Sequence, residues 1–156
     1  MILLVHMLFG AALGSLTNNI FLALLLAFLG HYFLDLFPHI EYLDSVEGSI
    51  QKIRATTLKN FLPDMLKVLL DFCLGLLLIF LFSKNQPLLY LYALVAIVPD
   101  GLTVASKLFP NRILTFHDKI HTRHIHYLTK QKKFSKFWKV FTQVLAVAIS
   151  VALLRG

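Results

Sequence analysis

Blocks of apolar residues alternate with polar segments along the chain. Five such blocks cover residues 2–14, roughly 20–37, roughly 62–82, roughly 88–109 and roughly 137–154. Within each block the apolar positions are nearly continuous, unlike the one-sided stripe of a soluble amphipathic helix. This pattern predicts about five hydrophobic α-helices that lie in a lipid environment.

The ends of the predicted helices are marked by proline and by short polar stretches. Pro38 ends the second block, because a helix seldom continues through proline. The sequence "PDG" at residues 99–101 interrupts the fourth block. The first block is short: at about 1.5 Å per residue it reaches roughly 20 Å, against a hydrocarbon core of about 30 Å. We expect a short, tilted or re-entrant helix there.

Composition supports the membrane interpretation. Of the 156 residues, 58% are hydrophobic and 15% are charged, and the mean hydropathy is +0.74. Soluble domains have about half apolar and about a quarter charged residues. The chain is too short for several domains. We therefore predict an all-α, polytopic membrane protein whose single integral-membrane domain spans residues 1–156.

The basic residues indicate the orientation of the predicted helices. One group lies between the second and third blocks, a larger group lies between the fourth and fifth, and the connection between blocks three and four has only Lys84. The two groups are Lys52, Arg54 and Lys59, and then Lys119, Arg123, Lys130, Lys132, Lys133 and Lys136. The positive-inside rule places both basic loops in the cytoplasm.

The segment 128–141, "LTKQKKFSKFWKVF", alternates lysines with aromatic residues. This pattern is typical of a helix that enters the membrane at the headgroup level. We expect Lys132, Lys133 and Lys136 to bind lipid headgroups, with Trp138 as an interfacial anchor. Membrane lipids are the expected partners of this segment, and nucleic acid is not.

Histidines and carboxylates gather towards one predicted membrane face. His31 and Asp35 are four residues apart and share a helix face. Asp100 falls in the cytoplasmic half of the fourth block, where an intramembrane carboxylate indicates function by default. The remaining histidines are placed at or near the same side, namely His6, His39, His117, His121, His124 and His126.

Imidazole nitrogen and carboxylate oxygen form a ligand set for a divalent metal, zinc first, with manganese and iron as alternatives. "HDKIH" places His117 and His121 at the i,i+4 spacing that lets two imidazoles share one ion. The predicted metal ligands are His6, His31, Asp35, His39, Asp100, His117 and His121. They can hold one ion with a full outer shell, or two ions about 3.5–4 Å apart. The alternative is that interfacial histidines meet only headgroups.

The pattern "GHYFLDLFPH" (residues 30–39), an early His6 before "FGAALG", a later "PD" and a histidine-rich loop resembles a known family. It is similar to the membrane-bound metal-dependent hydrolases, small helical proteins of bacterial and archaeal inner membranes. A looser similarity links it to the zinc-dependent phospholipases C, which carry a helical His-x3-Asp followed by proline and histidine in a multi-zinc site. The resemblance implies a helical fold, a divalent metal and hydrolysis. In that family an acidic residue follows "PH" closely, whereas here Glu41 and Asp44 are the candidates.

Three functions are compatible with these features. The first is a membrane hydrolase acting on a phosphoester or lipid-linked substrate at the cytoplasmic interface, with His39 or Glu41 as general base. The second is a protein that binds or transports divalent metal without hydrolysis. The third is a module that binds DNA or a partner through its basic loop. The positive-inside rule already accounts for the lysines of that loop. Self-association into a homo-oligomer stays open.

Overall fold

The fold is described from a computed structural model that covers residues 2–40, 61–83, 86–125 and 134–156. All regular structure in these ranges is helical, as predicted. The helices are α1 (Leu3–Ser15), α2 (Ile20–Asp35), α4 (Phe61–Phe82), α5 (Pro87–Ala96), α6 (Val98–Leu108), α7 (Arg112–Lys119), the π-helical turn η1 (Ile120–Ile125) and α9 (Lys136–Arg155).

Local chemistry explains several of the helix boundaries. The Asn19 side chain accepts a hydrogen bond from Leu22 N at 3.1 Å and caps α2, which is a preferred role of asparagine at a helix start. Pro87 occupies the first turn of α5, where a missing N–H costs nothing. The α2 helix ends at Asp35, slightly before the predicted end near Pro38.

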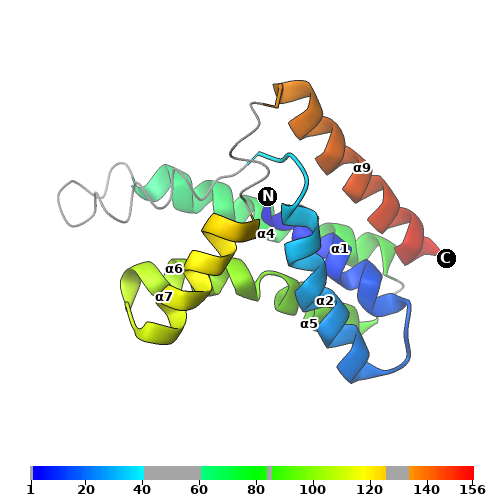
Figure 1. Cartoon of the computed structure of the whole chain (residues 1–156). Helices are drawn as coiled ribbons and strands as arrows, with labels where there is room; N and C mark the ends of the chain where they lie inside the picture. The colour runs from blue at the N-terminus through cyan, green and yellow to red at the C-terminus, as the bar shows by residue number, and fades with distance from the viewer. Residues whose placement is uncertain (1, 41–60, 84–85, 126–133) are drawn as a thin grey trace.

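The short first helix forms the centre of the bundle. In Figure 1, α1 lies among α2, α4, α5 and α9, and it packs against all four. Its buried side chains include Leu4, Met7, Leu8 and Ala11. The first apolar block is therefore the core of the fold.

Close helix packing around α1 depends on glycine. A Cβ atom at Gly14 would overlap the Tyr92 ring of α5, and one at Gly10 would overlap the Ala96 side chain. The absent side chains let α5 approach the α1 backbone directly. This close approach also brings the end of α5, and the break that follows it, to the middle of the molecule.

A carboxylate from α4 caps the start of α1. Asp71 is buried and its Oδ2 accepts a hydrogen bond from Leu4 N at 3.1 Å. The first N–H groups of a helix lack partners within that helix, so this contact satisfies one of them. It also fixes the end of α1 that carries His6.

Within the described ranges, two helices are long and apolar enough to cross a membrane: Met65–Phe82 within α4 and Lys136–Arg155, which is α9. The fourth apolar block is broken, with α5 and α6 bent by 45°, and this pair would be a third span if it crosses as one unit. The break falls at Ile97, and Pro99 lies in the first turn of α6. The α1 and α2 helices are shorter apolar helices. The five-span count thus stays a prediction.

Candidate metal centre

The C-terminal half of α2 supplies the first two residues of the candidate site. His31 and Asp35 project from one face of the helix, and His31 Nε2 lies 3.1 Å from Asp35 Oδ2. Both side chains are fully buried. The i,i+4 spacing on the helix therefore brings an imidazole nitrogen and a carboxylate oxygen next to each other, as the sequence predicts.

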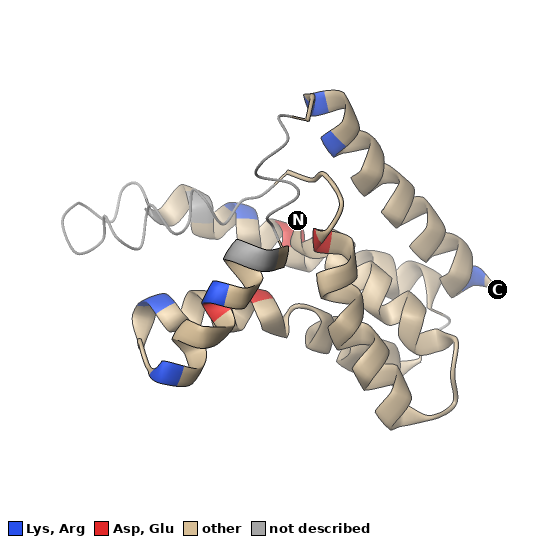
Figure 2. Ribbon diagram, in the orientation of Figure 1, with Lys and Arg blue, Asp and Glu red and all other residues tan. Residues whose placement is uncertain are grey.

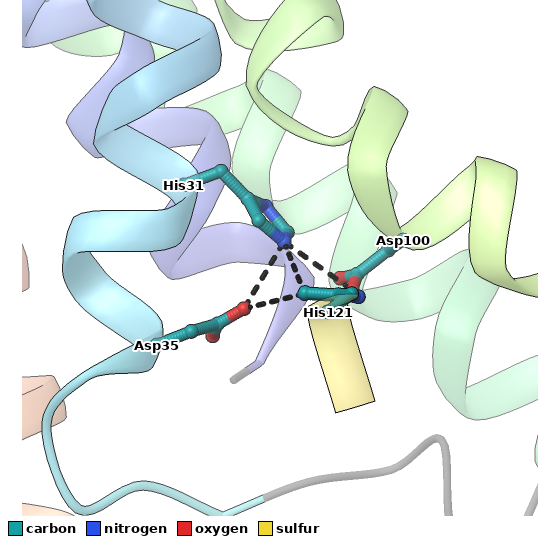
Figure 3. A group of neighbouring side chains, drawn as sticks. All are labelled: His31, Asp35, Asp100 and His121. Atoms are coloured by element: carbon teal, nitrogen blue, oxygen red, sulfur yellow. Dashed lines mark hydrogen bonds and ion pairs between the residues drawn. The ribbon is translucent and has the colours of Figure 1, made fainter. Parts of the chain in front are cut away.

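Two residues distant in sequence complete the group. Asp100 lies in the first turn of α6, just after the break, and its Oδ1 is 3.5 Å from His31 Nε2. His121 comes from η1, and its Nε2 lies 2.9 Å from Asp35 Oδ2 and 3.2 Å from His31 Nε2. Figure 3 shows the four side chains pointing towards one another.

The dimensions of the group fit the shell of a metal ion. One ligand atom from each of the four buried residues lies within 4.8 Å of the others. The contacts of 2.9–3.5 Å between these atoms compare with an edge of about 3.3 Å for a tetrahedron built on Zn–N bonds of about 2.0–2.1 Å.

The outer nitrogens of the two histidines are held by oxygen atoms. His31 Nδ1 lies 2.7 Å from Ala96 O, which can only accept a hydrogen bond. His121 Nδ1 lies 2.9 Å from Thr103 Oγ1, while the Thr103 hydroxyl donates to Pro99 O at 3.1 Å. Both imidazoles therefore carry their proton on Nδ1 when they are neutral.

This arrangement leaves the Nε2 lone pairs of His31 and His121 facing each other and facing carboxylate oxygen. Lone pairs at these distances repel one another unless a metal ion lies between them or a proton on one ring turns the contact into a hydrogen bond. Metal-binding histidines typically donate their other ring N–H to a carbonyl or similar acceptor. The side chains thus fit a divalent cation, and their oxygen and nitrogen donors suit zinc, manganese or iron.

Two further predicted ligands contact the other oxygen of Asp35. His6 Nε2 lies 3.3 Å and His39 Nε2 3.7 Å from Asp35 Oδ1. The His6 ring also stacks on His31, with ring centroids 4.0 Å apart. Neither nitrogen of this buried His6 ring makes a hydrogen bond within the described part of the chain. The structure therefore brings six of the seven predicted ligand residues together: four histidines contact Asp35, and Asp100 contacts His31.

The segment after α2 is fixed by α9, which positions His39. Thr142 Oγ1 donates a hydrogen bond to Pro38 O, and Gln143 Nε2 donates to Ile40 O at 3.1 Å. His39 is buried, and its Nδ1 lies 2.6 Å from Phe37 O. When the ring is neutral, its Nε2 lone pair therefore faces Asp35.

His117, predicted to share an ion with His121, lies outside the four-residue group. Its Nε2 is 2.9 Å from the Tyr32 hydroxyl, and its ring centroid is 5.7 Å from that of His121. Burial and the neighbouring His121 lower the pKa of His117 below its ordinary value. Tyr32 itself lies edge-on to both His31 and His121.

Sequence reasoning missed Tyr32, Thr103 and the carbonyl of Ala96. Tyr32 is adjacent to His31, but an α-helix normally directs neighbouring side chains to different sides. Thr103 follows Pro99 by four residues, and that spacing was the only local signal for its hydrogen bond to Pro99 O. A backbone carbonyl carries no signal in the sequence.

Other predicted functional residues lie at or beyond the limits of the described chain. Lys136 and Trp138 are exposed at the start of α9, and their contact with headgroups stays a prediction. Glu41, Lys132 and Lys133 are outside the described residues. Their predicted roles as general base and headgroup ligands remain predictions.

Comparisons with protein-family models, with curated proteins and with solved structures give no match. The class of protein is therefore defined by the structure alone. In the part of the chain that the structure describes, it is all-helical, with two helices long and apolar enough to cross a membrane and a buried His/Asp group that could hold a metal ion.

Proposed function

We propose that the protein is a membrane-embedded, metal-dependent hydrolase that acts on a phosphoester or lipid-linked substrate. The proposal depends on one observation: the Nε2 lone pairs of His31 and His121 converge on the carboxylates of Asp35 and Asp100. With neutral imidazoles, such a set of buried groups is costly without a metal ion, because each contact would join two acceptors.

In this proposal the four residues hold the metal, zinc being the first candidate. A bound divalent ion supplies Lewis-acid activation of water and of the scissile group. Ala96 O and Thr103 Oγ1 hold the imidazoles in the tautomer that binds the ion. His6 supports Asp35 from its other oxygen, or takes part in a second ion site with His39.

Proton-handling groups beside the metal ligands favour hydrolysis. The Nε2 atom of His39 is directed at Asp35, and a neutral imidazole there can accept a proton as a general base. The hydrogen-bonded pair of Tyr32 and His117 lies on the other side of the ligand histidines. Glu41 remains the second candidate base in the proposal.

The proposal includes the predicted membrane location and orientation of the protein. The resemblance to the membrane-bound metal-dependent hydrolases supports an inner membrane of a prokaryote, with basic loops in the cytoplasm and about five hydrophobic helices. A site near that face would meet substrates carried by lipid. Lys132, Lys133 and Lys136 are proposed to gather anionic headgroups.

A second candidate function is binding or transport of a divalent metal without hydrolysis. One observation favours it: four protein side chains surround a single point. Catalytic zinc sites usually have three protein ligands and an open position for water or substrate, whereas closed four-ligand sites are structural. The number of protein side chains bound to the metal therefore distinguishes the two functions: three with an open position favour hydrolysis, and four favour binding without hydrolysis.

The first experiment measures metal content by mass spectrometry on detergent-purified protein. Wild type is compared with the double variant His31→Ala/Asp35→Ala and with His117→Ala as a matched histidine control. We expect near-stoichiometric metal in wild type and in the control, and loss in the double variant. Absence of metal in wild type after incubation with zinc or manganese would instead identify an ion-pair network of protonated histidines, and would end the hydrolase proposal.

The second experiment separates the two candidate functions. Metal-loaded protein is assayed for hydrolysis of phospholipids and of model phosphodiesters, and for flux of labelled zinc into proteoliposomes. Hydrolysis that is lost in His31→Ala/Asp35→Ala supports the enzyme. Zinc flux without hydrolysis supports transport, and bound metal without either supports a binding protein.

A further inference from the structure

The helices α6 and α7 form a hairpin that projects from the bundle (Figure 1). They pack against each other, and Lys107 Nζ donates to Asp118 Oδ2 at 2.7 Å. The Asn111 side chain accepts from Leu114 N at 2.9 Å and caps α7. The hairpin is thus held together by its own contacts, and no other described part of the chain covers its outer face.

The outer face of α7 is apolar and highly exposed. The relative exposure of Ile113 is 80%, that of Phe116 is 65%, and Phe109 at the turn before α7 reaches 72%. Ile113, Phe116 and Ile120 follow the i, i+3, i+7 spacing of a single helix stripe. Yet α7 has only eight residues, or about 12 Å, and is far too short to cross a membrane.

The charges of the hairpin are basic and lie at both ends of this stripe. Arg112 and Lys119, the first and last residues of α7, are both exposed. Figure 2 shows blue basic positions on the projecting hairpin. Of the two acidic residues in α6 and α7, Asp118 pairs with Lys107 and Asp100 belongs to the metal centre. An apolar stripe bounded by basic side chains is the pattern of a helix that lies in the interface of an anionic membrane.

We propose that the α6–α7 hairpin lies in the headgroup layer of an anionic lipid surface, with Ile113 and Phe116 inserted between lipids. Arg112 and Lys119 then bind lipid phosphates, and their aliphatic stems lie along the apolar layer. The α6 helix follows α5 in a bent apolar pair that fits either a broken span or a re-entrant loop. The proposal takes the re-entrant arrangement, in which α5 enters the membrane and α6 returns to its surface. This proposal concerns the surface and is independent of hydrolysis.

The location of the hairpin connects this surface with the metal centre. The α7 helix continues directly into η1, which carries His121, and His117 of α7 contacts Tyr32 of α2. A lipid bound along α7 would therefore lie next to the ligand-bearing turn.

The test uses spin labels on the full chain in lipid nanodiscs, with the exposed Cys73 replaced by serine. Single labels are placed at Ile113→Cys and Phe116→Cys, with Leu69→Cys in α4 as a reference inside a candidate span and Lys119→Cys as a reference at the polar edge. Collisions with oxygen report the hydrocarbon layer, and collisions with a water-soluble nickel complex report solvent.

We expect labels at 113 and 116 to resemble the label at 69, with oxygen accessibility dominant, while the label at 119 meets the nickel complex. Dominant nickel accessibility at 113 and 116 would overturn the proposal. Labels that are immobile and reached by neither reagent would overturn it too, because they would indicate a protein partner or a second copy.

The charge requirement is tested by lipid composition. Labels at 113 should lie deeper in nanodiscs containing phosphatidylglycerol than in pure phosphatidylcholine. The variant Arg112→Gln/Lys119→Gln, labelled at the same site, should lose that difference. Equal depth in both lipids for the unmodified charges would overturn the anionic-surface proposal, whatever the result for metal content.

Discussion

The Nδ1 atom of His31 lies 2.7 Å from the main-chain oxygen of Ala96, the last residue of α5. This oxygen precedes the break between α5 and α6, and the same break directs Asp100 towards His31. The bend between α5 and α6 therefore contributes to the site in two ways. It orients one imidazole through a backbone carbonyl, and it places a carboxylate in the cluster.

Replacing Thr103 with valine should weaken metal binding. The substitution removes the oxygen that lies 2.9 Å from His121 Nδ1, and loss of an outer-shell partner typically costs about 10–100-fold in metal affinity. Competition with a fluorescent chelator measures the change. Thr103→Ser restores the hydroxyl and should bind metal like wild type; equal affinity in the valine variant would show that Thr103 does not orient His121.

Removing the metal should destabilise the protein. A ligand that binds only the folded state stabilises it, by about 2.7 kcal/mol when its free concentration is 100 times its Kd. Thermal unfolding in detergent should therefore shift to lower temperature when a chelator is added, and return when zinc is restored. His31→Ala/Asp35→Ala should show no response, and an identical chelator effect in that variant would point to binding elsewhere.

A single methyl group should disturb the packing of α1 on α5. Gly14→Ala would drive a Cβ atom into the Tyr92 ring, and overpacking a filled core typically costs about 1–3 kcal/mol. Gly101→Ala is the matched control, since nothing lies within 4 Å of its new Cβ. We expect a lower unfolding temperature for Gly14→Ala only; unchanged unfolding would mean that α5 does not lie so close.

The cap that α4 provides for α1 can be tested in the same assay. Asp71→Ala removes the acceptor for Leu4 N and should cost about 0.5–2 kcal/mol, as for other helix caps. Asp71→Asn keeps an acceptor oxygen and should recover much of this loss. Hydrogen exchange at the start of α1 should rise in the alanine variant; exchange that rises only elsewhere would argue against the capping role.

Local patterns predicted some parts of the site and missed others. The pair His31 and Asp35 was predictable because helical spacing alone puts them on one face. His117 and His121 have the same spacing, yet they meet different partners. His121 lies in η1, where the hydrogen bonding changes from i→i+4 to i→i+5. The His117 side chain instead forms a hydrogen bond with the Tyr32 hydroxyl. Spacing could not distinguish them, because the outcome depends on a neighbouring helix.

The break in the fourth block shows the same limit. The motif "PDG" correctly indicated an interruption, but the helix breaks at Ile97 and resumes with Pro99 in its first turn. Proline is well tolerated in the first turn of a helix, so the interruption moves to the residues before it. A local rule located the bend to within a few residues, and its angle required the structure.

The sequence by itself determined the helical class, the apolar blocks and the residues able to bind a metal, because these depend on side-chain chemistry and on spacing within one helix. Only the tertiary structure decided that the short first helix is the core, and that Asp100 and His121 join His31 and Asp35 across some 65–90 residues of sequence. Those contacts are set by how helices pack against one another. The packing of each helix depends on the side chains of every helix that it contacts, as where the glycines of α1 meet Tyr92 and Ala96 of α5. No single stretch of the chain contains that information.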